Sequence, residues 1–273
     1  MRNLFVFAAC IAAPSLTYAQ SVWITYLAAR GTLPQSQCWT FSGSSSPAPS
    51  LVDNAVEIGP SSYGGTQTFA RAVNTDFVRG TVVEAEIYII NSAYRTNPCG
   101  AGQRAGTVFS VADNQGRVVV VGIGNSQVYM TCSDPSFVGV NSPTAAVACQ
   151  GQWRLFRLEV LGTQARLYVD GVLTLTCPTG SIRGTPRRVT FGDGSICAEG
   201  HARFRSLRAL AVVECSADFN RDGFVDGFDY DEFVTCFEGG SCPCDQSADF
   251  NTDGFADGFD YDDFVSAFEA GCL

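Results

Sequence analysis

Residues 216–238 read SADFNRDGFVDGFDYDEFVTCFE, and residues 247–269 read SADFNTDGFADGFDYDDFVSAFE. The second segment follows the first at a constant offset of 31 residues, without a gap. A period of this length is typical of a repeated supersecondary unit. The C-terminal part of the chain is therefore predicted to be one small module built from two copies of the same element.

Each copy carries oxygen-bearing residues at the spacing of a twelve-residue calcium loop, with glycine at position 6, where the chain must turn sharply. The predicted ligands, with position 7 acting through its backbone carbonyl, are Asp218, Asn220, Asp222, Phe224, Asp226 and Asp229 in the first copy and Asp249, Asn251, Asp253, Phe255, Asp257 and Asp260 in the second. Two calcium ions are therefore expected. The alternative is a disordered acidic tail, which the repetition of every ligand argues against.

An apolar face at helical spacing follows each loop. Its members are Tyr230, Phe233, Val234 and Phe237 in the first copy and Tyr261, Phe264, Val265 and Phe268 in the second. No helix is expected before either loop, because the preceding segments are too short or contain Cys242-Pro243-Cys244. Each copy is thus predicted to be half an EF-hand, with Asp in place of the usual Glu at position 12. We expect the two helices to pack antiparallel.

This arrangement resembles the type I dockerin module over about residues 215–273. The resemblance implies calcium binding by the ligands named above and a cohesin-like protein partner. In that family, small hydroxyl residues at loop positions 10 and 11 help to choose the cohesin, whereas this chain has Gly227-Phe228 and Gly258-Phe259 there. The departure leaves the calcium ligands intact and argues against cohesin binding of the familiar kind.

The charge of the chain is unevenly distributed. From residue 215 onward the sequence has fifteen acidic residues and one Arg, a net charge of −14, whereas residues 1–214 carry about +4. The acidity is explained by metal coordination, so the overall charge of −10 says little about partners. The Arg residues are scattered and not interleaved with aromatic residues, so no nucleic-acid binding is expected.

Residues 1–19 have the pattern of a secretory signal peptide: Arg2, an apolar run at Leu4–Ala13, and Thr17-Tyr18-Ala19 before Gln20. A lipid anchor on Cys10 is a weaker alternative, because the residues before it match poorly. No later stretch reaches about 18 uninterrupted apolar residues, so no membrane span is expected. We predict a secreted or extracellular protein, held at a cell surface if it docks there, with a body at 20–212 and the repeated module at 213–273.

Eleven cysteines remain after the predicted signal, six in the body (38, 99, 132, 149, 177, 197) and five in the tail (215, 236, 242, 244, 272). In an exported protein they are expected to form disulfides. Short intervals favour Cys132 with Cys149 and Cys177 with Cys197, and the odd count leaves one thiol over. A zinc site from Cys236, Cys242 and Cys244 is a weaker alternative, since it lacks CxxC spacing and a nearby His.

The body is predicted to be all-β. In Thr81–Ile90, Val83, Ala85, Ile87 and Ile89 alternate with Glu84, Glu86 and Tyr88. Arg154–Val160 repeats this alternation, and Asp170-Gly171 is a hairpin signal. Ten or more such short segments separated by Gly, Asn and Pro indicate a two-sheet sandwich.

Four segments, beginning at Trp153, Arg166, Val189 and Ala202, resemble the last half of the concanavalin A-like, laminin-G-type jelly roll over about residues 150–212. That fold hosts lectins, glycan-hydrolysing enzymes and adhesion modules. The expected fold class is mainly β, a jelly-roll sandwich followed by a small α module of two half EF-hands.

Catalytic candidates are few. Glu84 and Glu86 lie about 7 Å apart along one strand face, within glycosidase range. Family members that hydrolyse β-glucans carry Glu-x-Asp-x-Glu on this strand, and the third acid is missing here, so solvated outer-face carboxylates are the preferred interpretation. The single His, His201, has no GxSxG partner and is interpreted as a loop residue.

Glycan-contact and structural-metal candidates are weaker. The aromatic residues that could stack on sugar rings are Trp39, Tyr63, Tyr94 and Trp153, with the polar loop 94–106 as a rim. Asp113, Asn125 and Asp193 could hold a structural calcium but show no loop motif.

The sequence thus favours a secreted calcium-binding modular protein without catalytic activity. Its sandwich would bind carbohydrate or a surface, and its dockerin-like tail would dock to a protein. The first alternative is a dockerin-tethered glycoside hydrolase of the concanavalin A-like class, acting in polysaccharide degradation. The second is a surface structural protein whose tail serves only for stability.

Overall fold

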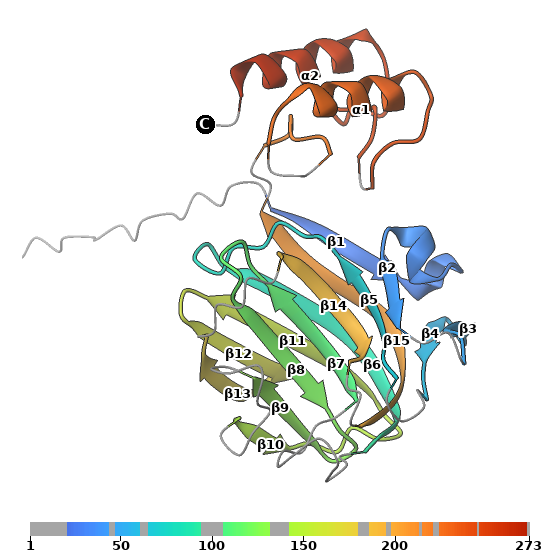
Figure 1. The fold of residues 1–273 in the computed structure, drawn as a ribbon, viewed down its shortest axis with the longest axis vertical. Helices are drawn as coiled ribbons and strands as arrows, with labels where there is room; N and C mark the ends of the chain where they lie inside the picture. The colour runs from blue at the N-terminus through green and yellow to red at the C-terminus, as the bar shows by residue number, and fades with distance from the viewer. Residues whose placement is uncertain are drawn as a thin grey trace, which may run out of the picture.

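A computed structural model describes residues 21–43, 47–60, 65–93, 106–131, 142–179, 186–194, 198–212, 215–220, 224–244 and 246–271. The predicted signal segment 1–19 lies outside these ranges, so it stays a prediction. The described chain forms a β-sandwich followed by two helices at one end of it (Figure 1). Among the described residues, no helix is long and apolar enough to cross a membrane.

One sheet has eight strands, in the order β13-β12-β11-β6-β15-β4-β3, with β1 also paired to β15. These strands are β1 (Ser21–Leu27), β3 (Ser50–Val52), β4 (Ala55–Ile58), β6 (Thr81–Ala93), β11 (Trp153–Leu161), β12 (Gln164–Val169), β13 (Val172–Pro178) and β15 (Glu199–Val212). Every pairing is antiparallel. The long strands β6 and β15 lie side by side at its centre.

The second sheet has seven strands, in the order β10-β9-β8-β7-β14-β5-β2. They are β2 (Thr40–Gly43), β5 (Gln67–Arg71), β7 (Thr107–Ala112), β8 (Val118–Ile123), β9 (Gln127–Thr131), β10 (Thr144–Ala146) and β14 (Arg188–Asp193). Two 3-10 turns, η1 (Ala28–Arg30) and η2 (Pro34–Gln37), connect β1 to β2. The predicted fold class, a two-sheet β-sandwich with a small helical C-terminal part, is confirmed.

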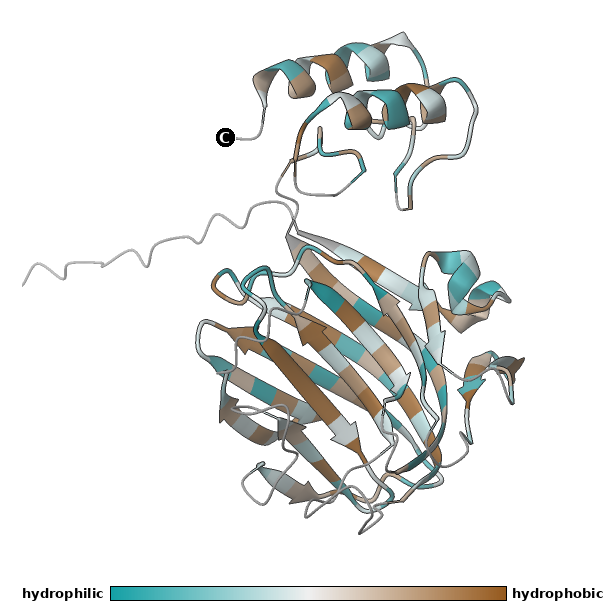
Figure 2. Ribbon diagram, in the orientation of Figure 1, coloured by the Kyte–Doolittle hydropathy of each residue, from teal (hydrophilic) through white to brown (hydrophobic). Residues whose placement is uncertain are grey.

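The core between the sheets is made by the inward residues of each strand, which alternate with outward ones along β6 and its neighbours (Figure 2). Phe191 of β14 lies within an aromatic cluster, with ring centroids 5.8 Å from Tyr26, 5.1 Å from Trp39 and 5.0 Å from Phe204. Burial of large aromatic side chains is a dominant favourable term for such a core. Trp39 is only 2% exposed, so its predicted contact with sugar rings is wrong.

The predicted hairpin at Asp170-Gly171 joins β12 to β13. Asp170 and Gly171 have φ of 50° and 81°, the left-handed conformations that a tight two-residue hairpin requires. The Asp170 carboxylate also accepts a hydrogen bond from the backbone N–H of Leu155 and pairs with Arg154, which anchors the turn to β11. The sequence signal at this turn is confirmed.

The C-terminal module contains α1 (Gly227–Phe237) and α2 (Gly258–Ala270). Tyr230 near the start of α1 contacts Phe268 near the end of α2, and Phe237 near the end of α1 contacts Tyr261 near the start of α2. These crossed contacts mean that the helices run antiparallel, as the repeated apolar faces predicted. No helix precedes either loop in the described segments 215–220 and 246–250.

One disulfide connects the sandwich to the C-terminal module, and another lies within the module. Cys38, directly after η2, is bonded to Cys244 between the two repeats, and Cys236 of α1 is bonded to Cys242. These two bonds consume all three cysteines of the zinc alternative, which is therefore wrong. The Cys38–Cys244 bond also joins a body cysteine to a tail cysteine, which short sequence intervals could not suggest.

The predicted pairing of Cys132 with Cys149 is wrong, because Cys149 is a free thiol. Its side chain is completely buried in the sandwich core, and this burial raises the pKa of the thiol to about 11. A buried, protonated thiol is poorly reactive. Cys177 and Cys215 are disulfide-bonded, and the proposed Cys177–Cys197 pairing stays a prediction because Cys197 lies outside the described residues.

Candidate functional site

The last position of each predicted calcium loop is held in the same way in both copies. Asp229 accepts hydrogen bonds from the backbone N–H groups of Asn220 at 2.9 Å and Asp226 at 2.9 Å. Asp260 accepts the corresponding bonds from Asn251 at 3.0 Å and Asp257 at 2.8 Å. Both carboxylates are completely buried. The two loops are therefore closed by the same internal bonds, and the repetition of the sequence is reproduced in the structure.

The backbone donors from Asn251 and Asp257 hold the pKa of Asp260 below its usual range. Hydrogen bonds to the charged form of a carboxylate stabilise that form. Position 12 of the second loop is consequently an ionised carboxylate at neutral pH, which is the state that a calcium ligand requires.

Position 9 of each loop also begins the exiting helix. Asp226 is the N-cap of α1 and accepts from the N–H of Phe228, and Asp257 caps α2 and accepts from Phe259, both at 2.9 Å. Together with Asp229 and Asp260 these residues form capping boxes, which satisfy backbone donors that a helix start leaves free. The same carboxylates thus serve the helix starts and the predicted ion sites.

The remaining ligands of the second loop are held in place by local hydrogen bonds from the backbone. Asp249 Oδ2 accepts from the N–H of Gly254, Asn251 Oδ1 from Asp253, and Asp253 Oδ1 from Phe255. Gly254 has φ of 98°, so the glycine predicted at position 6 occupies a conformation that favours glycine. The loop is therefore ordered as a tight turn around its oxygens.

One oxygen of the second loop lacks any hydrogen bond. Asp249 Oδ1 is buried and has no partner among the described residues. A buried carboxylate oxygen without a donor costs about 1–3 kcal/mol or more. A bound Ca²⁺ would satisfy this oxygen, and every other predicted ligand in the second loop belongs to the hard-oxygen class that Ca²⁺ prefers. The residues of the loop therefore fit a calcium ion.

Among the described residues, the carboxylates alone do not make up a metal site. Across the described ranges, no three His, Cys, Asp or Glu side chains converge closely enough to hold a metal. A complete ligand shell would have to include the amide oxygen of Asn251 and the carbonyl of Phe255, as the loop spacing predicts. Asp222 of the first loop lies outside the described residues.

Sequence reasoning missed the residues that join the two loops. Phe219 and Phe250, both at loop position 2, pack against the stacked rings of Phe233 and Phe264 at centroid distances of 5.2–6.0 Å. Gln246 donates from Nε2 to the carbonyl of Phe219 at 2.9 Å, which ties the linker to the first loop. The sequence Ser-Ala-Asp-Phe, which begins both repeats, could have indicated that the phenylalanine at loop position 2 has a structural role in each copy.

The outer face of the eight-stranded sheet holds Glu84 and Glu86, and neither is arranged as a solvated carboxylate. Arg157 on β11 and Arg208 on β15 lie opposite Glu84 in the sheet register. Arg157 donates to Glu84 at 2.5 Å and Arg208 donates from Nε at 2.6 Å, while Arg205 pairs with Glu86. Glu84 is only 7% exposed. The interpretation of Glu84 as a solvated surface acid is therefore wrong.

The electrostatics of Glu84 disfavour acid catalysis. Burial would raise its pKa, but hydrogen bonds from Arg208 and Arg157 outweigh that effect and hold the pKa below its usual range. A glycosidase general acid needs a raised pKa, so that it is protonated when it meets the substrate. The environment of Glu84 is the reverse of that arrangement.

Two tryptophans on this face are covered by arginines. The guanidinium of Arg205 lies 3.9 Å from the ring centroid of Trp153, and that of Arg208 lies 4.5 Å from Trp23. Tyr88 contacts Trp153 with centroids 5.5 Å apart. These cation–π contacts stabilise the face and occupy Trp153, so its predicted contact with a sugar ring is not supported.

His201 lies within β15, so its interpretation as a loop residue is wrong. Its Nε2 is 2.8 Å from Glu57 Oε1, and Arg203 donates to the other oxygen of Glu57 at 2.7 Å. Although burial would raise the pKa of Glu57, the bonds from His201 and Arg203 lower it. This group is an ion-pair network at the strand pairing of β4 with β15.

The predicted structural calcium in the sandwich is not supported. Asp113 follows β7 and is bound by the guanidinium of Arg117, whereas Asp193 pairs with Thr107 at the opposite end of β7. Asp113 is six residues after Thr107, the register partner of Asp193, so the two acids lie about 20 Å apart along the strand, too far for one ion. Asn125 instead bonds Ser92 and Asn91. Tyr63, Tyr94 and the loop 94–105 lie outside the described residues.

Comparisons with known proteins give the fold. No family model matches the chain, and no curated protein matches it. A carbohydrate esterase from the Shiga toxin-encoding bacteriophage phi24B has a similar structure, with a TM-score of 0.52, 14% identity, and coverage of 70% of this chain and 98% of that chain. The body is a jelly-roll sandwich.

Other solved structures are more distant. The Crh5 transglycosylase has a TM-score of 0.49 at 13% identity and matches 70% of this chain and 86% of its own. A laminarinase, an endo-1,3-beta-glucanase of Thermotoga petrophila RKU-1, has a TM-score of 0.43 at 11% sequence identity. The match covers 64% of this chain and 92% of the laminarinase chain. At 14% identity, the likeness to the carbohydrate esterase concerns the fold and does not extend to an activity.

Proposed function

We propose that this protein is a secreted calcium-binding modular protein. Its C-terminal module binds two calcium ions and docks to a protein partner, and its jelly-roll body binds carbohydrate or a surface without catalysis. The observation that carries the calcium assignment is the buried Asp249 oxygen without a donor, inside a loop that is closed like its counterpart in the first copy.

Calcium would act on the module chiefly through its charge. The ions would be held by Asp218, Asn220, Asp222, Phe224, Asp226 and Asp229 in one loop and by Asp249, Asn251, Asp253, Phe255, Asp257 and Asp260 in the other. Fifteen acidic residues in about 59 positions repel one another, and neighbouring pairs cost of order 1 kcal/mol each even when well screened. Ion binding offsets this repulsion and is expected to be coupled to the stability of the module.

The carbohydrate assignment of the body is supported by the jelly-roll neighbour that is itself a carbohydrate esterase. The non-catalytic assignment is supported by the geometry of Glu84, which is 7% exposed and whose carboxylate is held by Arg157 and Arg208. A cohesin-like partner is proposed for the tail from its dockerin-like loops, with Gly-Phe pairs at positions 10 and 11.

Calcium titration of the full, disulfide-intact chain by isothermal calorimetry tests the first part. We expect two sites in the wild type and one in Asp249→Asn. Asp262→Asn is the matched control, because it removes an exposed carboxylate on α2 outside the predicted ligand set. Absence of binding at millimolar calcium, or equal losses in both variants, contradicts the proposal.

A glycan array together with a hydrolysis panel tests the body. We expect binding without product formation. Robust hydrolysis of a β-glucan that disappears in Glu84→Gln would establish the hydrolase alternative instead.

A further inference from the structure

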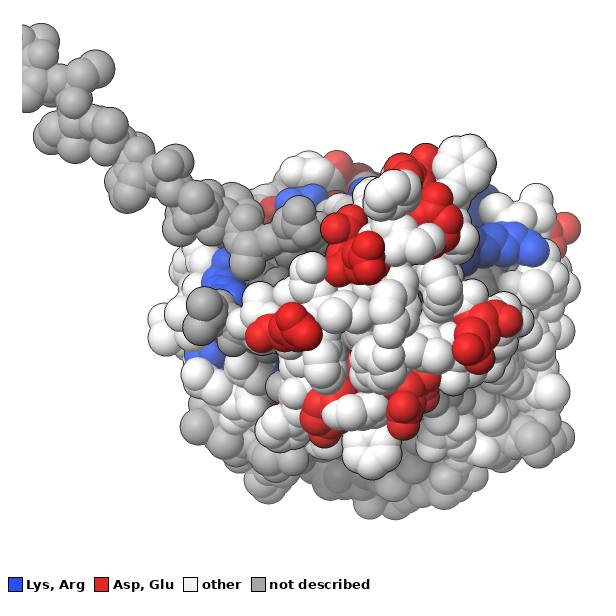
Figure 3. All heavy atoms as spheres, turned by 90° about the horizontal axis from the view of Figure 1, so that it is seen from above, with Lys and Arg blue, Asp and Glu red and all other residues white. Residues whose placement is uncertain are grey.

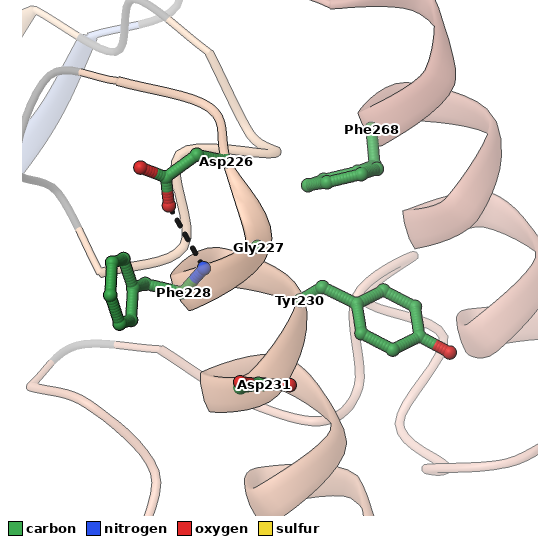
Figure 4. Close-up of a pocket in the computed structure, with 6 residues that line it drawn as sticks. All are labelled: Asp226, Gly227, Phe228, Tyr230, Asp231 and Phe268. Atoms are coloured by element: carbon green, nitrogen blue, oxygen red, sulfur yellow. Dashed lines mark hydrogen bonds between the residues drawn. The ribbon is translucent and has the colours of Figure 1, made fainter.

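An open groove of about 500 Å³ lies between the start of α1 and the end of α2. Figure 4 shows its lining, with Phe228, Tyr230 and the carboxylates coming from the α1 side and Phe268 from α2. The lining residues are Asp226, Gly227, Phe228, Tyr230, Asp231 and Phe268. Tyr230 and Phe268 pack against the core formed by Phe233 and Phe264, and Phe228 and Asp231 extend the groove to the exposed surface.

The groove combines aromatic rings with carboxylates. Tyr230 and Phe268 contact each other, with ring centroids 6.0 Å apart, and Phe228, which points away from them across the start of α1 (Figure 4), is 70% exposed. Asp231 is exposed, and Asp226 uses one oxygen to accept from the N–H of Phe228. A large exposed aromatic residue close to the exposed carboxylate of Asp231 is not explained by the packing of the module.

Both charged residues that line the groove, Asp226 and Asp231, are acidic. The module has fifteen acids and a single Arg, Arg221, which lies outside the described residues. Seen from above, the face over the helices carries scattered acidic side chains on an uncharged surface, and basic side chains appear toward its margin (Figure 3). An anionic ligand or an anionic membrane would therefore be repelled here.

We propose that this groove receives an exposed arginine or lysine side chain of a protein partner, an inference that rests on the proposed docking function. The aromatic rings would contact the apolar stem and the cation, because such rings attract cations at their faces. Asp231 would pair with the charged end, because Asp226 already caps α1 and is a predicted calcium ligand. The long-range negative field of the module would favour encounter with a basic partner surface.

The second repeat carries the same chemistry at the other end of the helix pair. Asp257, Gly258, Phe259, Tyr261 and Asp262 repeat the α1 residues, and Phe237 takes the place of Phe268. Phe237 and Tyr261 are 5.9 Å apart between centroids, and Phe259 is 72% exposed. The exposed phenylalanine and the neighbouring acids are thus a repeated feature of the module. This repetition argues that the exposure of Phe228 is not incidental.

The test is an NMR titration of the full, calcium-loaded and disulfide-intact chain with N-acetyl-L-arginine amide. N-acetyl-L-citrulline amide is the matched probe, since it has nearly the same shape without the charge. We expect the arginine probe to shift the resonances of Phe228, Tyr230 and Phe268, and the citrulline probe to bind at least tenfold more weakly. Asp231→Asn and Phe228→Ser should each weaken binding at least threefold, and Glu232→Gln, the same charge change on an exposed neighbour, should leave it unchanged.

Three outcomes would overturn the inference. If the arginine and citrulline probes bind equally, the positive charge does not contribute to binding. If Glu232→Gln weakens binding of the arginine probe as much as Asp231→Asn does, the attraction comes from the overall negative charge of the module and not from the groove. Tighter binding of glucosamine than of the arginine probe assigns the groove to an amino sugar rather than a polypeptide. Calcium binding by the same samples is measured separately by calorimetry. If the chain binds calcium but the groove binds no arginine probe, this inference is wrong and the calcium assignment still holds.

Discussion

Phe233 and Phe264 stack face to face, with ring centroids 4.0 Å apart and ring planes 7° from parallel. They occupy the same position in the two repeats, and both side chains are completely buried. The hydroxyl groups of Tyr230 and Tyr261, another equivalent pair, hydrogen bond to each other at 2.5 Å. Each repeat therefore supplies half of one small core, and neither copy can bury its apolar face without the other.

Replacement of either stacked phenylalanine should destabilise the module to a similar extent. Phe233→Ala and Phe264→Ala are each expected to lower the free energy of unfolding by about 3–5 kcal/mol, because each deletes a fully buried ring at the centre of the helix pair. Denaturant unfolding in saturating calcium measures this. Phe228→Ala, at an exposed position, should change stability by less than about 0.5 kcal/mol. A large difference between the two buried sites would contradict the symmetric core.

Glu84→Gln should destabilise the sandwich. The substitution leaves Arg208 and Arg157 without their shared carboxylate, although Arg157 keeps Glu159. Breaking a buried ion pair costs about 3–5 kcal/mol, but the two arginine side chains are 49% and 41% exposed, so we expect about 1–2 kcal/mol. Thermal unfolding of the full chain measures the loss. The control is Glu86→Gln, whose side chain is 30% exposed and pairs with one arginine, so its effect should be smaller.

The ion pairs of Glu84 with Arg208 and Arg157 predict that the stability of the sandwich depends on pH. The folded pKa of Glu84 lies below its ordinary value of 4.5, so the pair adds stability above about that pH, and the contribution is lost as pH falls through the folded pKa. Glu57, bound by His201 and Arg203, has a lowered pKa and acts in the same direction. The thermal midpoint of the sandwich should therefore fall on acidification below about pH 4.5, and Glu84→Gln should lose less over that interval than the wild type. Parallel pH curves for the two proteins would rule this out.

The arrangement around Glu84 also marks what the sequence can and cannot predict. Alternation in Thr81–Ile90 correctly separates inward Val83 and Ile87 from outward Glu84, because the period of a strand is local. The partners of Glu84 are 73 and 124 residues away, and only the sheet register brings Arg157 and Arg208 opposite it. Burial of this acid therefore depends on tertiary pairing that no local pattern contains.

The C-terminal module shows the same division. Loop spacing and the apolar helix faces were enough to predict two equivalent loops and an antiparallel helix pair, since both follow from residue order within one repeat. The bond between Cys38 and Cys244, with a sequence separation of 206, was not predictable, because sequence intervals carry no information about which surfaces meet.

That disulfide should restrain the module against the sandwich. Cys38→Ser with Cys244→Ser removes a cross-link over a very long loop, for which chain-entropy arguments give about 4–5 kcal/mol. We expect the double variant to keep the thermal transition of the sandwich but to be cleaved much faster in the segments around residues 213–216 and 239–247 during limited proteolysis. Cys149→Ser is the control, because Cys149 is a free thiol. Unchanged cleavage of the double variant would show that the disulfide does not restrain the module.

Calcium should be needed for the stability of the module and not for that of the sandwich. The two loops concentrate carboxylates, and Asp249 keeps a buried oxygen without a donor, so without a cation the charge repulsion opposes the hydrogen bonds that close the loops. A module of this size has a small core to offset the repulsion. Its disulfides restrict the unfolded chain, so a partly compact calcium-free state is expected when they are intact. Hydrogen exchange of the full chain measures the protection of backbone amides in the module and in the sandwich in one experiment.

In EGTA we expect fast exchange at α1 and α2 amides, slow exchange after calcium is added, and no change in β6, β11 and β15, which serve as the internal control. Asp249→Ala and Asp218→Ala should each abolish the calcium-induced protection of both helices, because neither helix can bury its apolar face without the Phe233–Phe264 contact. Loss of protection in one helix alone would mean that the repeats fold independently. Full protection in EGTA after reduction of the disulfides would contradict the coupling of folding to calcium, because neither the ion nor the cross-links would then be holding the acidic loops closed.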